Sequence, residues 1–160
     1  MDYLWTPWRY AYVTQAGRAE GCVFCQKQTP GDDQRQYVIH RGRHNYLVLN
    51  IYPYTVGHLM VVPCRHVATL EECQAEELGE LMELTRRAEA ALRRLYRPQG
   101  FNIGMNIGAS AGAGVAGHLH MHVLPRWEAD SNFVSVIGET RVLPEELPVT
   151  WAKLRGEFGS

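Results

Sequence analysis

One long stretch of helical periodicity constrains the fold of this chain more than any other feature. Between residues 78 and 95, apolar or small side chains recur at intervals of three and four, with Glu and Arg between them. The repeating positions are Leu78, Leu81, Met82, Thr85, Ala88, Leu92 and Leu95. This pattern predicts an amphipathic helix of roughly six turns that ends near Pro98 and buries one face against another layer.

The apolar segments around this helix have the composition of short strands. Hairpin-like succession of such segments with a single long helix predicts an α+β fold, in which the helix packs on one face of an antiparallel five-stranded sheet. The segments are YVIHRGRHNYLVLN (37–50, two strands and a turn), GHLMVVP (57–63), FNIGMNIG (101–108) and GHLHMHVLPRW (117–127). The polar segment 28–36 predicts an exposed loop, and Pro144 and Pro148 should limit regular structure in the tail.

The 160 residues are most economically one domain, 1–160, with an N-terminal segment 1–30 and a C-terminal extension 128–160. The formal net charge of -1 gives no broad basic field, which argues against nucleic acid or a membrane surface as a partner. No apolar window is long enough to cross a membrane, and the N-terminus lacks the apolar core of a signal peptide. We therefore expect a cytoplasmic protein.

Alternate histidines mark the last predicted strand, at His118, His120 and His122. On a strand these side chains share one face, while the apolar residues between them face the core. Three interpretations fit: a solvated strand face, one metal ion bound by all three, or one imidazole acting as nucleophile or general base. The glycine-alanine loop just upstream, 108–117, can present backbone N–H groups to an anion, which favours phosphate chemistry.

A C-x-x-C pair lies near the N-terminus, at Cys22 and Cys25. This spacing lets one short turn present two thiolates to zinc, and a reducing compartment argues against disulfides. A thioredoxin-like interpretation requires a βαβ context that the sequence does not show. Two thiolates do not complete a tetrahedral site, so two further ligands are required.

These motifs together resemble the histidine triad (HIT) superfamily. The segment from Asn106 to Leu124 resembles its signature, His-x-His-x-His followed by apolar residues, and the segment 46–66 resembles the part that carries a ribose contact and a further active-site histidine. The resemblance covers residues 22–127. The ending PRWEADSNFVSVIG is similar to the bacterial branch that includes diadenosine tetraphosphate phosphorylases and hydrolases.

The resemblance implies an enzyme that cleaves an adenine nucleotide conjugate, a dinucleoside polyphosphate or a nucleoside phosphoramidate, at its α-phosphate. His120 would attack the phosphorus and form a covalent nucleotidyl-histidine, with His122 and His58 in the same site. The implied nucleotide contacts are Asn50 with the ribose, Asn106 and the backbone of Gly112, Gly114 and Val115 with phosphate oxygens, and Ile51 beside the base.

Three further residues have two interpretations each. Val48 and Phe24, like Ile51, would flank the base or belong to the core. Trp127 would cover the nucleotide or pack under the C-terminal segment.

For the metal, the resemblance implies a structural zinc held by Cys22, Cys25, His66 and His118, with no organic cofactor. The histidine strand would then serve two sites. Cys64 and Cys73 remain ordinary thiols. The family's homodimer, which joins two sheets edge to edge, is expected here as well.

The loop before the histidines departs from the family pattern, because residues 114–117 carry no hydroxyl or amide for the leaving phosphate. Both hydrolysis and phosphorolysis with inorganic phosphate as acceptor therefore remain open. Two rival classes also remain: a nucleotide- or zinc-binding regulatory module with weak catalysis, and a metallohydrolase that uses all three histidines on one ion.

Overall fold

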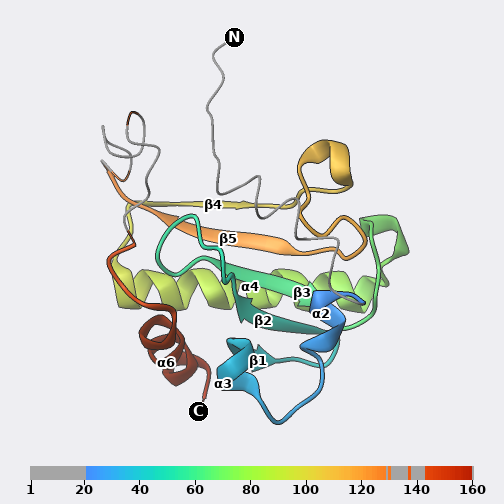
Figure 1. The fold of residues 1–160 in the computed structure, drawn as a ribbon, viewed down its shortest axis with the longest axis horizontal. Coiled ribbons are helices and arrows are strands. Elements are labelled where there is room, and N and C mark those ends of the chain that lie inside the picture. Colours follow the sequence, from blue (N-terminus) through green and yellow to red (C-terminus); the bar gives the residue numbers. More distant parts are fainter. Residues whose placement is uncertain (1–20, 129, 131–136, 138–142, 160) are drawn as a thin grey trace.

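The computed structural model describes residues 21–128, 130, 137 and 143–159. Its strands form one antiparallel five-stranded sheet in the order β1-β2-β3-β5-β4 (Figure 1). The strands are β1 (Val38–Arg41), β2 (Asn45–Leu49), β3 (Leu59–Pro63), β4 (Gly100–Gly104) and β5 (Met121–Arg126). The α+β prediction is confirmed, with β4 at one edge of the sheet and β1 at the other.

The long helix α4 (Ala75–Tyr96) packs across one face of this sheet (Figure 1). Its buried face contributes Leu81, Leu84, Ala88, Ala91 and Leu92 to a core shared with β2, β3 and β5. The predicted period is thus confirmed, except that Met82 is 55% exposed. A capping box of Gln74 and Glu77 begins the helix, and Arg97 ends it in the left-handed conformation.

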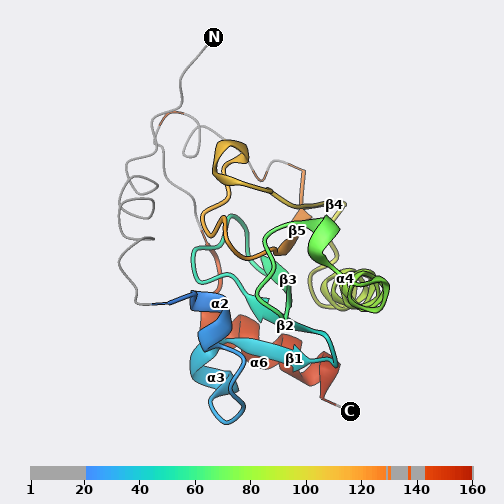
Figure 2. The same cartoon turned by 90° about the vertical axis from the view of Figure 1, so that its right-hand side faces the viewer.

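The opposite face of the sheet carries the C-x-x-C segment (Figure 2). Cys22 precedes the short helix α2 (Val23–Gln26), and Phe24 from that helix packs into a second core cluster with Val48 and Met60. Strand β2 is buried along its whole length because α4 covers one of its faces and α2 the other.

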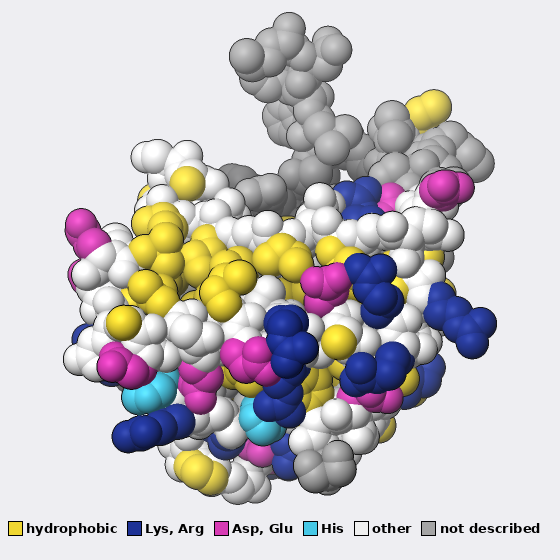
Figure 3. Space-filling model, turned by 180° about the vertical axis from the view of Figure 1, so that it is seen from behind, with side chains coloured by type: hydrophobic (Ala, Val, Ile, Leu, Met, Phe, Trp, Pro, Cys, Tyr) yellow, Lys and Arg dark blue, Asp and Glu magenta, His cyan; other side chains and the backbone are white. Residues whose placement is uncertain are grey.

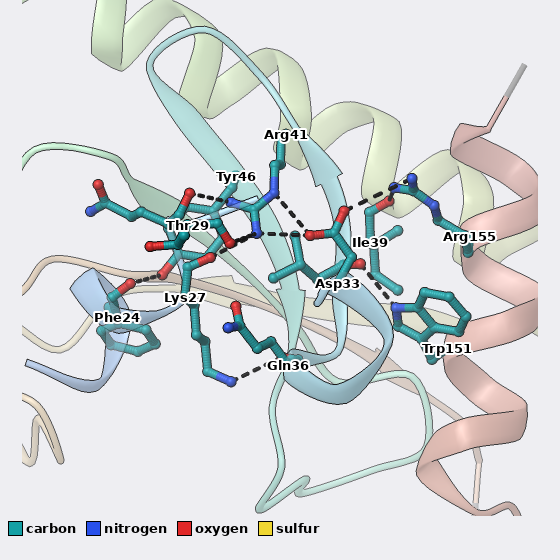
Figure 4. Close-up of polar contacts among 12 residues, drawn as sticks. Phe24, Lys27, Thr29, Asp33, Gln36, Ile39, Arg41, Tyr46, Trp151 and Arg155 are labelled. Carbon is teal, nitrogen blue, oxygen red and sulfur yellow. Dashed lines mark hydrogen bonds and ion pairs between the residues drawn. The ribbon is translucent and has the colours of Figure 1, made fainter. Parts of the chain in front are cut away.

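The β1 edge is closed by side chains from α6 (Leu147–Phe158) and α3 (Asp33–Gln36) (Figure 4). Trp151 Nε1 donates to the carbonyl oxygen of Val38 at 2.9 Å, and Arg155 donates to that of Ile39 at 2.5 Å. Arg41 binds Asp33 and the carbonyls of residues 27 and 28. The bonds from Trp151 and Arg155 satisfy β1 carbonyls, while those of Arg41 tie the preceding segment to the strand.

Two predictions for the connecting segments are wrong. Helix α6 lies in the tail where Pro148 was expected to limit regular structure, because proline is well tolerated in the first turn of a helix, where no N–H bond is lost. Helix α3 lies within the segment expected to be a loop. Short 3-10 turns cover Leu70–Glu72 and Ala109–Ala111. No helix in the described part of the chain has the length and apolar content of a membrane span.

Candidate functional site

The three alternate histidines do not all lie on a strand, which corrects one expectation. Strand β5 begins at Met121, and residues 117–120 form the end of a turn, a bend and two residues without regular secondary structure. The backbone N–H of Leu119 bonds to the carbonyl of Val67 at 2.7 Å, outside the sheet ladder. This departure from strand geometry lets the imidazoles separate: His118 turns toward His66, and His120 turns toward His122.

His120 is buried and held in one tautomer. Its Nδ1 donates to the carbonyl oxygen of His118 at 2.9 Å, because a carbonyl can only accept. The neutral ring then carries its lone pair on Nε2. Burial lowers the pKa of His120, which favours this neutral form. His120 therefore has the electronic state of a nucleophile.

His122 has the opposite tautomer to His120, and His58, the residue just before β3, sets it. The backbone N–H of Tyr54 donates to His58 Nδ1 at 3.2 Å, so the proton of neutral His58 is on Nε2 and is donated to His122 Nδ1 at 2.9 Å. The proton of neutral His122 is then on Nε2. His122 Nε2 can therefore donate a hydrogen bond to a substrate oxygen atom.

Tyr54 completes this corner, and the sequence analysis missed it. Its ring lies 4.9 Å from that of His58 and stacks at 6.4 Å on His122. Aromatic residues in the segment YPYT, just before His58, were the available signal.

The stability of the protein should depend on pH through His122. Burial, and then the neighbouring His120, lower the pKa of His122 to about 4. The unfolded chain takes up this proton below its usual pKa of about 6.5, so stability is present above that pH and lost as pH falls toward 4. Between pH 7.5 and 5, urea unfolding should show that the wild type loses about 2 kcal/mol more than His122→Gln. Equal losses in the two proteins would contradict this assignment.

The residues predicted to bind nucleotide lie around the histidines. Asn50 approaches His58, with Nδ2 at 3.3 Å from Nδ1, and its Oδ1 accepts the N–H of Tyr52 at 2.9 Å. The β4–β5 pairing sets Gly104 opposite His122, and Asn106 follows two residues beyond the end of β4. Ile51 is 44% exposed on the same loop as Asn50.

The glycine-rich loop 108–117 ends beside the histidines. Gly112 adopts a positive φ of 88°, which glycine accepts without strain, and Gly114 is half-buried in the following turn. Val115 packs against the core cluster of Phe24, and its carbonyl accepts the N–H of His118 at 3.3 Å. The loop is thereby anchored beside the histidines.

Three other residues with a predicted nucleotide contact make contacts within the protein instead. Val48 and Phe24 are buried in the core, which favours the packing interpretation for both. Trp127 directly follows β5, a strand roughly 16 Å long that begins just after His120, and its Nε1 donates to the carbonyl of Tyr96 at 3.2 Å. The structure does not bring Trp127 to the histidines of the same chain.

The four predicted metal ligands converge on one point. The ligand atoms of Cys22, Cys25, His66 and His118 all lie within 4.8 Å of one another. Cys22 Sγ is 3.2 Å from His118 Nδ1, and Cys25 Sγ is 3.3 Å from His66 Nδ1. The corresponding edge of a tetrahedral zinc site is about 3.6 Å, so the donor set fits such an ion.

His118 is already oriented for this task. Its Nε2 donates to the carbonyl oxygen of Pro63 at 2.9 Å, which leaves the Nδ1 lone pair toward the thiols. Cys64 and Cys73 are outside the cluster. The four residues can hold a metal. His118, whose buried imidazole belongs to this cluster, also supplies the carbonyl that accepts from His120 Nδ1.

The fold and site define an α+β protein in which alternate histidines, joined by a histidine that directly precedes a neighbouring strand, adjoin a glycine-rich loop. The chain belongs to the HIT family, whose domain model matches residues 32–129. It is 41% identical over 165 residues to AP-4-A phosphorylase of Mycobacterium tuberculosis (strain H37Rv), covering 99% of this chain and 85% of that protein.

Two further comparisons agree. Bis(5'-nucleosyl)-tetraphosphatase [asymmetrical] of Schizosaccharomyces pombe is 31% identical over 93 residues, covering 58% of this chain and 50% of that protein. A Zn-bound histidine triad family protein from Mycobacterium smegmatis matches with a TM-score of 0.68 and 26% identity, over 86% of this chain and 92% of that one. The family inferred from the histidine signature is confirmed.

Proposed function

We propose that this protein is a nucleotidyl hydrolase or transferase that cleaves an adenine nucleotide conjugate at its α-phosphate through a covalent intermediate on His120. The observation that carries the proposal is the hydrogen bond from His120 Nδ1 to the His118 carbonyl, which leaves the Nε2 lone pair free to attack. The names of the M. tuberculosis and S. pombe relatives support a dinucleoside polyphosphate such as diadenosine tetraphosphate as the substrate.

In the first step, His120 Nε2 forms a bond to the α-phosphorus, and the bond from phosphorus to the bridging oxygen breaks. The polyphosphate leaves with the bonding electrons. His122 donates its Nε2 proton toward the phosphate oxygens, while His58 holds its Nδ1. In the second step an acceptor oxygen displaces His120 and restores the free imidazole.

Asn50, Asn106 and Ile51, with the backbone of the Gly112–Val115 loop, would hold the nucleotide during both steps. Their grouping around the histidines supports this role. For Trp127 we retain only a contact with a nucleotide on a second chain, since its own chain places it beside Tyr96.

We further propose that Cys22, Cys25, His66 and His118 bind zinc. Two thiolates and two imidazoles are a common structural zinc set, and one structural relative is zinc-bound. Bound zinc would neutralise the thiolates and anchor the turn. We propose a cytoplasmic location as well, because a reducing compartment keeps cysteines out of disulfides and available to bind zinc.

The separation of the imidazoles argues against the metallohydrolase alternative. His118 faces the thiols, whereas His120 bonds to a carbonyl and His122 bonds to His58. The regulatory alternative requires a site without turnover, but the burial and fixed tautomers of these histidines favour chemistry.

The acceptor can be identified from the products. Diadenosine tetraphosphate incubated with the protein and inorganic phosphate should yield ADP and ATP if phosphate is the acceptor, as the 41% identity to a phosphorylase favours. Water as acceptor gives AMP and ATP instead. Anion-exchange chromatography of the products distinguishes the two. Absence of cleavage of both this substrate and an adenosine phosphoramidate would contradict the proposed function.

We also propose a homodimer formed along β4. This edge strand exposes Ile103, the segment after it exposes Ile107, and α4 exposes Met82. Hydrophobic side chains gather across the upper part of the face seen from behind (Figure 3). A second copy would cover these side chains and pair the open strand edge.

The dimer should therefore be sensitive to a charge at its centre. Ile103→Asp is expected to sediment as a monomer at concentrations where the wild type is a dimer, because an unpaired carboxylate would be buried. Val149→Asp, at a similarly exposed position on α6, is the control and should remain dimeric. A monomeric wild type would contradict the proposal.

A further inference from the structure

Phe24 lies between the metal cluster and the proposed nucleophile. In the sequence it lies between Cys22 and Cys25, and its ring contacts two histidines. The ring centroid is 5.5 Å from that of His118, edge-on, and 5.0 Å from that of His120, tilted by 44°. One side chain thus contacts a ligand imidazole and a catalytic imidazole together.

The position of Phe24 is fixed independently of these histidines. The buried hydroxyl of Tyr46 donates to the Phe24 carbonyl at 2.8 Å, which ties the turn to strand β2 (Figure 4). The ring is only 4% exposed and packs with Val48 and Met60. The two cysteines hold the same turn from either side whenever a metal is bound. Phe24 is therefore a rigid support.

His120 needs such a support because a single hydrogen bond does not fix a ring. The bond from Nδ1 to the His118 carbonyl sets the tautomer, but the ring can still tilt about that bond. Phe24 contacts the ring at 5.0 Å, and His122 meets it edge-on at 4.8 Å. Between them they restrict the tilt and direct Nε2. A displacement of about 1 Å at a reacting atom can cost roughly 100-fold in rate.

We propose that Phe24 is a positioning residue that aligns the His120 imidazole and links the metal-bearing turn to the nucleophile. The inference rests on the proposed function of His120. It differs from a role beside the base, because a base contact would change substrate binding, whereas alignment changes the rate of the chemical step. The small exposed fraction of Phe24 also leaves little surface for a base.

The test compares Phe24→Leu with Val23→Ala, a change in the same turn at a half-buried residue with no ring contact to either histidine. Both are assayed as metal-loaded proteins with diadenosine tetraphosphate and phosphate. We expect Phe24→Leu to lower kcat by roughly 10- to 100-fold with KM changed less than about twofold. Val23→Ala should change neither, and metal content should stay equal in all three proteins.

A second readout does not depend on turnover. Nitrogen-15 relaxation of the His120 imidazole should show a rigid ring in the wild type and faster ring motion in Phe24→Leu, with the Nδ1–H tautomer kept in both because the His118 carbonyl sets it. If the leucine variant loses metal, Phe24→Met carries the same measurements, because methionine fills similar volume without a flat ring.

Each outcome decides the matter. A raised KM with unchanged kcat would assign Phe24 to the base and overturn the inference, as would unchanged kcat with an equally rigid His120 ring in the variant. The proposed function fails separately, if wild-type protein forms no nucleotidyl intermediate and cleaves neither substrate.

Discussion

His120→Asn is expected to lower kcat by roughly 10⁴- to 10⁶-fold while the metal content remains equal to that of the wild type. Asparagine keeps a side-chain donor near the position of Nδ1, so the bond to the His118 carbonyl can persist. It lacks the Nε2 lone pair that would attack phosphorus in the proposed mechanism. Steady-state assay and metal analysis of the same preparation measure the two quantities together.

His40→Asn is the matched control. His40 lies on β1, where its ring is 5.5 Å from Phe158 of α6, and we expect its replacement to leave kcat within about twofold. Loss of metal in His120→Asn would instead favour the alternative in which all three histidines bind one ion. Retained turnover would remove His120 from the role of nucleophile.

Cys25→Ser should remove the metal and destabilise the protein. With free zinc held 1,000-fold above the dissociation constant, the wild type gains about 4 kcal/mol of unfolding free energy, and the variant should lose this gain. Cys64→Ser, which changes a half-buried thiol outside the cluster, should cost roughly 1 kcal/mol or less and keep the metal. Chemical denaturation with and without a chelator measures both.

Chelation also provides the internal check. It should lower the stability of the wild type and of Cys64→Ser to a similar degree, and leave Cys25→Ser unchanged. Equal responses of all three proteins to the chelator would mean that the four residues do not hold the stabilising metal.

The fold was largely predictable because its elements carry strong periods. Leu81, Ala88 and Leu92 repeat at helical spacing, and the buried strand β3 reads as a continuous apolar run. Helix α6 was not predictable in this way. Its stability comes from contacts with distant chain, such as Trp151 to the Val38 carbonyl, and Pro148 gave a misleading local signal.

For the site, residue types were predictable but their geometry was not. Alternation placed His118, His120 and His122 on one strand face, whereas the chain leaves strand geometry before Met121 and separates the rings. The tautomers depend on backbone atoms of Pro63, Tyr54 and His118, which no side-chain pattern reveals. Phe24 likewise had both a base and a core interpretation until its ring contacts were seen.

The central claim is that His120 becomes covalently nucleotidylated, and one measurement tests it most directly. Wild-type protein is mixed with diadenosine tetraphosphate, quenched within milliseconds under alkaline denaturing conditions that preserve a phosphoramidate, digested, and mapped by mass spectrometry. We predict one AMP unit on the imidazole of His120, formed faster than steady-state turnover. Turnover with no AMP-bearing peptide, or with AMP on a different residue, would contradict the account.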